Sequence, residues 1–166
     1  MEDVANVFMI FAGVFLVILI FILYGYILSG IGLSRMAKTV GIKDHWLAWL
    51  PAANMFIVGE LAGPITLFGH KFESFGVPMV IVSVATTVLG VIPIFGWLLL
   101  IAYQVLFFIV IHHVYKRFNP GKAVFYTLLS IFCVILIPVL FFLLRNKVPA
   151  DISNSGNQIL DSPKSM

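Results

Sequence analysis

Histidine is the residue type in this sequence with the widest chemistry, because imidazole binds transition metals, particularly alongside carboxylates. The four histidines are His45, His70, His112 and His113. His112 and His113 are adjacent, so on a helix their side chains point about 100° apart and do not readily hold one ion. We expect the histidines to lie at a hydrated boundary, with a metal site as the alternative.

Asn54, Glu60 and Gln104 stand within long apolar runs. A polar or ionisable group in hydrocarbon is costly unless it is paired or hydrated, which makes each a candidate for function. Glu60 is at membrane depth if its segment crosses a bilayer, and otherwise lies in water near the end of a helix. We expect Gln104 to hydrogen-bond to Thr86 or Thr87 on a neighbouring helix, a contact worth about 1 kcal/mol.

Signatures of an enzyme are missing from the sequence. It contains no His-Glu-x-x-His, no glycine-rich phosphate loop and no Cys-x-x-Cys. The serines on or beside the apolar runs have no lysine or histidine at a spacing that suggests a nucleophile and its base. The single cysteine, Cys133, excludes an intramolecular disulfide. We therefore expect a protein that is not an enzyme and needs no cofactor.

The composition of the chain indicates which environment surrounds its surface. Of its 166 residues, 61% are hydrophobic and 10% are charged, whereas a water-soluble domain carries roughly 25% charged residues. The net charge of +3 comes from basic residues in short clusters between apolar runs. Such clusters indicate membrane topology and not nucleic-acid binding. We expect a multi-pass protein of the cell membrane.

The apolar runs predict about four transmembrane helices, since each crossing takes about 20 mostly apolar residues. The first runs from Val7 to about Leu28. The stretch 77–115 is long enough for two helices and is interrupted at 92–96, which predicts a helical hairpin. The last runs over 123–144, where Pro138 removes a backbone hydrogen bond and predicts a kink or a break.

The segment 46–63 is apolar enough to enter the bilayer but contains a proline, an asparagine and a glutamate. Trp46 and Trp49 mark its start, and tryptophan favours the headgroup level. We expect an interfacial or re-entrant helix, with a full span as the alternative. These elements predict an all-α membrane domain over residues 1–148, followed by a tail over 149–166 that is too polar to fold.

Lysine and arginine set the orientation, because cytoplasmic loops are enriched in both. If the segment 46–63 does not cross, most basic residues lie inside, but Arg145 and Lys147 fall outside. If it crosses, the basic residues divide more evenly between the two faces. A break at Pro138 that returns the chain to the cytoplasmic side would place all ten basic residues inside, and we keep it as a further alternative.

Basic residues beside the apolar runs are candidates for holding anionic lipid headgroups, each contact being worth about 1 kcal/mol near the surface. They are Arg35, Lys38, Lys43, Lys116, Arg117 and Lys122. Their simpler role is to fix topology, and both roles can coexist. Gly25, Ser29 and Gly32 form a small-residue stripe on the first helix, which permits close packing within the chain or in a homo-oligomer.

Two stretches of the sequence, 35–51 and 116–138, share a theme. Each has a basic segment with a glycine, followed by an aromatic-rich apolar run that contains a proline. The likeness is too loose to indicate a duplication.

Several short motifs follow one another in a distinctive order. They are K-x-x-G from Lys38, W-x-x-x-x-P-x-x-N from Trp46, A-G at Ala62, I-P-I at Ile92 and a basic loop over 116–122. This order resembles an uncharacterised family of small polytopic membrane proteins of Gram-positive-type bacteria, which have a proline-containing last helix. The resemblance covers 33–144 and implies a shared architecture without an assigned activity.

The expected function is that of an integral membrane accessory or interaction protein that binds partner helices or lipid. One alternative is a small transporter, a channel-like protein or a bacteriocin-immunity protein, with a polar pathway through Asn54, Glu60 and Gln104. Another is a membrane enzyme acting on lipid or peptide. Expected partners are the bilayer, anionic lipid headgroups, and another membrane protein or a second copy, but no nucleic acid.

Overall fold

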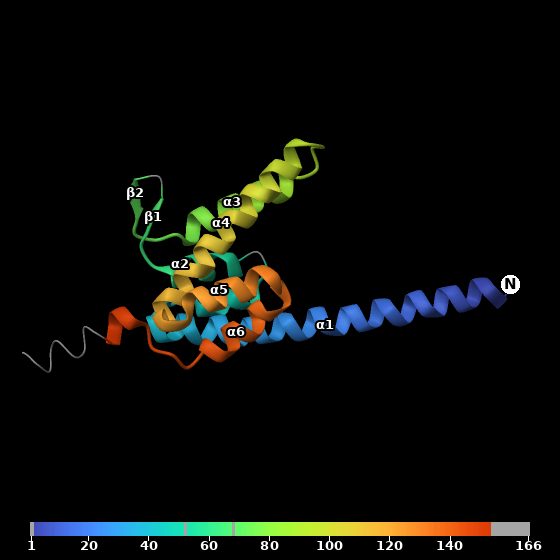
Figure 1. The fold of residues 1–166 in the computed structure, drawn as a ribbon, viewed down its shortest axis with the longest axis horizontal. Helices are drawn as coiled ribbons and strands as arrows, with labels where there is room; N and C mark the ends of the chain where they lie inside the picture. The colour runs from blue at the N-terminus through green and yellow to red at the C-terminus, as the bar shows by residue number, and fades with distance from the viewer. Residues whose placement is uncertain (1, 52, 68, 154–166) are drawn as a thin grey trace, which may run out of the picture.

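The computed structural model describes residues 2–51, 53–67 and 69–153. Most of the predicted polar tail, residues 154–166, lies outside the described residues. The chain is mostly helical, as predicted (Figure 1). The elements are α1 (Glu2–Val40), η1 (His45–Trp49), α2 (Asn54–Ala62), β1 (Ile65–Leu67), β2 (His70–Phe72), α3 (Gly76–Leu89), α4 (Phe95–Phe118), η2 (Pro120–Lys122), α5 (Ala123–Phe132), η3 (Val134–Leu136) and α6 (Ile137–Leu144), where η marks a 3-10 helix. The antiparallel hairpin of β1 and β2 was not predicted from the sequence.

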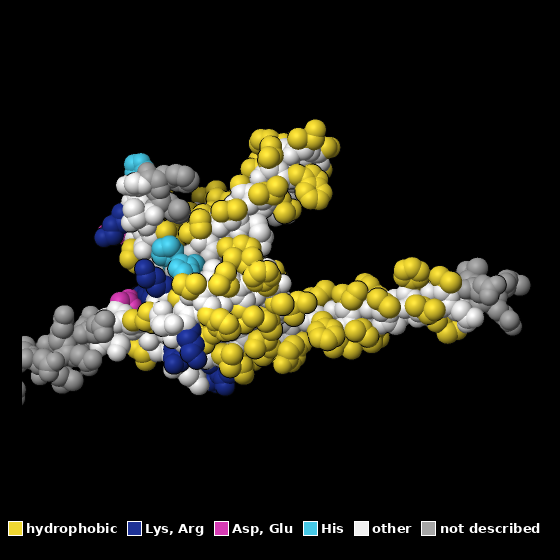
Figure 2. All heavy atoms as spheres, viewed as in Figure 1, with side chains coloured by type: hydrophobic (Ala, Val, Ile, Leu, Met, Phe, Trp, Pro, Cys, Tyr) yellow, Lys and Arg dark blue, Asp and Glu magenta, His cyan; other side chains and the backbone are white. Residues whose placement is uncertain are grey.

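The first helix is far longer than one membrane crossing requires. α1 contains 39 residues, which is about 58 Å at 1.5 Å per residue. All side chains over residues 5–24 are exposed, and only the part of the helix after them packs into the body of the protein. Figure 2 shows the free half of α1 covered in hydrophobic side chains.

Two helices, Ala5–Val40 and Phe95–Phe118, are long and apolar enough to cross a membrane. By contrast, α3 has 14 residues, α5 has 10 and α6 has 8, and a crossing takes about 20. Four transmembrane helices are therefore not confirmed. The result for the described residues is an all-α chain, apart from the small β-hairpin, with two candidate membrane spans.

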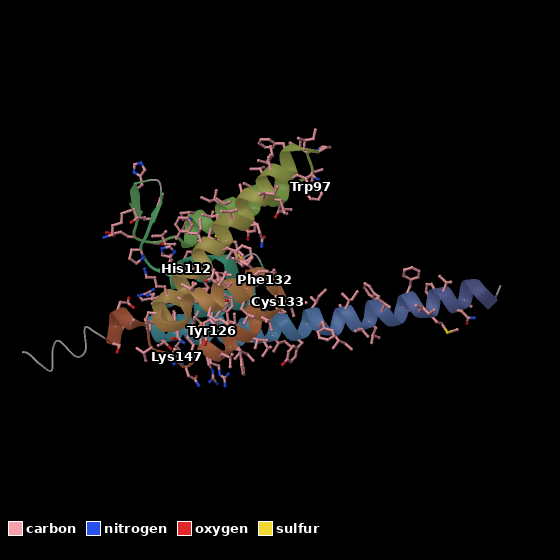
Figure 3. The ribbon with its side chains drawn as sticks, viewed as in Figure 1. Trp97, His112, Tyr126, Phe132, Cys133 and Lys147 are labelled. Carbon is pink, nitrogen blue, oxygen red and sulfur yellow. The ribbon has the colours of Figure 1, made fainter. Side chains whose placement is uncertain are left out.

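The predicted hairpin of α3 and α4 is present, and its tip stands away from the body (Figure 1). α3 ends at Leu89 and α4 begins at Phe95. Gly96 permits the tight turn, because a Cβ atom there would lie 2.4 Å from the carbonyl oxygen of Gly90. Trp97, labelled in Figure 3, is exposed at this tip.

The segment 46–63 does not form the single helix that we expected. It is divided into η1, with 5 residues, and α2, with 9. η1 runs back along α1, so that the Trp49 ring packs on Gly30. α2 then returns to the level at which α1 ends, where Glu60 lines the same cavity as Lys43. The segment therefore begins and ends at one end of the body.

The last apolar run, 123–144, doubles back in the same way, so it forms no single continuous helix and the predicted span there is not confirmed. α5 ends at Phe132, and α6 follows only after η3. The break precedes Pro138, which occupies the first turn of α6, where the missing N–H of proline is tolerated. Figure 3 shows Cys133, at the break, and Lys147, after α6, at opposite ends of the body.

The two halves of the chain repeat one arrangement. Each long helix, α1 or α4, is followed by a broken segment that runs back along it and then returns along the other long helix. Thus α1 packs against η1 and α6, whereas α4 packs against α5 and α2. The stretches 35–51 and 116–138, which share a sequence theme, occupy equivalent places. Met36, Ile57 and Tyr115 are fully buried between these elements.

Glycine at position 32 should be required for the contact between α1 and α6. A Cβ atom at Gly32 would lie 2.7 Å from the carbonyl carbon of Phe141, whereas one at Gly13 would meet nothing within 4 Å. We expect Gly32→Ala to lower the free energy of unfolding by about 1–3 kcal/mol through overpacking. Gly13→Ala, the matched control on the same helix, should not lower it. Thermal unfolding in detergent measures both, and equal midpoints would contradict this contact.

Candidate functional site

The described lysines and arginines gather at one end of the body, away from the free half of α1 and from the tip of the α3–α4 hairpin (Figure 2). Of the ten lysines and arginines, only Lys164 lies outside the described residues. The other nine lie in the last two turns of α1, in the last turn of α4, or on the loops and short elements beside them. We call this region the basic end.

Arg117 is the centre of the basic end, because its guanidinium joins three parts of the chain. Its Nη1 donates hydrogen bonds to the carbonyls of Glu60, at 3.4 Å, and Leu61, at 3.2 Å. These carbonyls belong to the last turn of α2, where helical partners run out, and that of Glu60 also accepts from the N–H of Gly63 at 3.1 Å. Its Nε and Nη2 donate to the Asp151 carboxylate at 3.1 Å and 2.9 Å. Arg117 thus fixes the C-terminal end of α2 and the segment that follows α6.

One cavity beside Arg117, with a volume of about 420 Å³, contains charges of both signs. Its lining includes Lys43, Asp44, Glu60 and Glu73. The Glu60 carboxylate accepts a hydrogen bond from the Ser74 hydroxyl. Glu60 therefore lies in a polar cavity at the basic end.

A second cavity, of about 430 Å³, is also lined by Arg117, and we call it the Arg117 cavity. Its polar lining is Thr66, His113, Lys116, Arg117 and Asp151. The Nδ1–H of His113 donates to a backbone carbonyl one turn earlier in α4, at 2.9 Å. Lys116 is exposed and forms no ion pair within the described part of the chain.

The structure does not bring the four histidines together. His45 donates to the backbone carbonyl of Lys43, and His70 is exposed on β2. Thr127 donates its own hydroxyl proton to a backbone carbonyl, so it accepts the hydrogen bond from His112. Over residues 2–51, 53–67 and 69–153, no group of three or more His, Cys, Asp or Glu side chains is placed to hold a metal ion.

The three polar candidates within apolar runs are also kept apart. Asn54 lies at the start of α2, and its Oδ1 is buried without a hydrogen-bond partner among the described residues. Gln104 lies in a groove of about 590 Å³ between α3 and α4. Thr86 and Thr87 line the same groove, but their hydroxyls donate to backbone carbonyls of α3. The expected hydrogen bond from Gln104 to either threonine is absent from the described structure.

The six basic headgroup candidates divide into two groups. Lys43, Lys116 and Arg117 line the two cavities. Arg35, Lys38 and Lys122 are exposed and line neither of them.

Sequence reasoning missed Asp151, the anionic partner of Arg117. It was assigned to the polar tail, whereas the described structure continues through it to residue 153. A carboxylate 34 positions from its arginine has no local sequence signal.

No protein-family model, curated protein or solved structure matches this chain. The resemblance described from the motifs therefore stays a prediction.

The ion pair at the basic end should make stability depend on pH. Hydrogen bonds from the Arg117 guanidinium hold the pKa of the Asp151 carboxyl below its ordinary value of 3.8. A lowered pKa in the folded state stabilises the fold above that ordinary value, and the contribution is lost as the pH falls through the folded pKa. Thermal midpoints in detergent should therefore be higher for the natural chain than for Asp151→Asn at about pH 6, and should converge toward about pH 2. A difference that does not change with pH would contradict this assignment.

Proposed function

We propose that this chain is an integral membrane accessory protein that binds partner helices or lipid through its exposed apolar helices. The observation that carries this proposal is the free half of α1. Every side chain over residues 5–24 is exposed, and none of the most apolar window of this helix is buried. A helix that is apolar all round must be covered by lipid or by other helices, because water leaves it unsolvated.

The proposed topology has α1 and the α3–α4 hairpin entering the bilayer from the basic end. The two broken segments then enter from the cytoplasmic face and return to it. This arrangement places all nine described basic residues, including Arg145 and Lys147, on the cytoplasmic side, as the positive-inside rule requires.

The backbone at the two breaks supports this topology. Non-helical backbone is tolerated at membrane depth only where its polar groups are bonded within the protein. The N–H groups of Leu50 and Asn54 donate to carbonyls at the first break, and those of Cys133 and Leu136 do so at the second.

Transport is the weaker proposal. Glu60 and Gln104 line different cavities, and Glu60 lies at the basic end. The polar pathway that a transporter needs would have to pass between separate sites. The described residues therefore favour contact with lipid or helices over passage of a solute.

Photocrosslinking from α1 in intact cells tests the proposed function. A benzophenone amino acid at Phe15, which is 68% exposed on the free half, should give adducts with lipid or with a partner membrane protein. The same probe at Lys38, exposed at the basic end, is the control for a position facing water and should give far fewer lipid adducts. Recovery of the chain in the soluble fraction, or equal lipid labelling from both positions, would contradict the proposal.

A further inference from the structure

We propose that the Arg117 cavity binds the phosphate headgroup of an anionic phospholipid, in competition with the Asp151 carboxylate. This inference rests on the proposed membrane location, and it names the class of lipid that the protein selects. It assigns Lys116 and Arg117 as the cationic groups of the site.

Arg117 is prepared for an anion with two oxygens. Its Nη1 donates to two backbone carbonyls of α2, which orient the guanidinium. The remaining edge, formed by Nε and Nη2, presents two N–H groups side by side. Both donate to Oδ2 of Asp151, and Nε also donates to Oδ1 at 3.3 Å. Two oxygens of a phosphate fit the same planar donor pair.

Asp151 is a displaceable occupant of this edge. Its side chain is 53% exposed, whereas that of Arg117 is 17% exposed. The carboxylate can therefore leave for water at little cost in solvation, but the guanidinium cannot follow it. An anion that enters the cavity accepts from the same Arg117 N–H groups, and so replaces the charge-assisted hydrogen bonds that Asp151 gives up.

The rest of the cavity is suited to a negative ligand. Lys116 contributes a second cation that has no ion pair in the described structure. The Thr66 hydroxyl and the His113 ring add polar groups, and among the described residues Asp151 is the only carboxylate in the lining. Departure of Asp151 leaves two cations facing one cavity of about 430 Å³.

A lipid headgroup is favoured over a free phosphate compound because of where the cavity lies. Lys116 and Arg117 are in the last turn of α4, one of the two candidate spans. The end of a span is the level of the headgroups, where each basic side chain gains about 1 kcal/mol from anionic lipid. The effective concentration of neighbouring lipid there is high, so a soluble phosphate compound below millimolar concentration competes poorly with it.

Native mass spectrometry of the purified full chain in neutral detergent tests the proposal, with phosphatidylglycerol and phosphatidylcholine as the two probes. The natural chain should bind phosphatidylglycerol preferentially. Lys116→Gln should weaken that binding about fivefold, and Asp151→Asn should strengthen it. Lys122→Gln is the matched control, because Lys122 is exposed near the same end of α4 but lies outside the cavity. Lys122→Gln should weaken the binding clearly less than Lys116→Gln does.

Several results would overturn the proposal. Equal weakening by Lys116→Gln and Lys122→Gln would mean that the attraction is diffuse, and weaker binding by Asp151→Asn would mean that Asp151 is not a competitor. Thermal midpoints of the variants, measured in the same detergent, separate loss of binding from loss of fold.

Displacement of the lipid by glycerol phosphate at equal concentration would assign the cavity to a soluble phosphate compound instead. Loss of lipid selectivity, with lipid adducts still formed from Phe15, would remove this inference and leave the proposed membrane function intact. If lipid selectivity and lipid adducts from Phe15 are both absent, this inference and the proposed membrane function are both contradicted.

Discussion

The fold depends on hydrogen bonds to the last carbonyls of its two short returning helices, α2 and α6. α2 and α6 stop at the basic end, and each must find partners for its last carbonyls. Arg117 donates to two carbonyls of α2 and reaches Asp151, whereas Arg145 donates to the carbonyl of Phe142 and lies over its ring. An arginine thus fixes the end of α2 and the end of α6 at the level where the long helices α1 and α4 also end.

Close approach of helices makes this return path possible. Gly32 lets the backbone of α6 lie directly on α1, and Gly59 lets the start of α3 lie on α2. Gly30 accommodates the Trp49 ring, and the Trp49 carbonyl accepts a hydrogen bond from Tyr26. Small residues are common where helices meet within membranes. Here they pack both broken segments against the long helices, so the breaks are supported from inside the protein.

Long apolar runs were predictable from the sequence, and short elements were not. The α3–α4 hairpin followed from the length of 77–115 and its interruption at Pro93. Pro138 correctly signalled a break, but the break lies earlier because proline is accommodated in the first turn of α6. The strands β1 and β2 have 3 residues each, too few for a clear alternation. Among the headgroup candidates, tertiary contacts alone distinguish Lys116 from Lys122.

The most direct test of the proposed topology is cysteine labelling with an impermeant reagent in a Cys133→Ser background. Single cysteines would replace Gly121 and Asn146, on either side of the second broken segment, and Val91, at the exposed hairpin tip. We expect Gly121→Cys and Asn146→Cys to be labelled only from the cytoplasmic face, and Val91→Cys only from outside. Labelling of the first two positions from opposite faces would mean that the segment crosses the membrane, and would contradict the account.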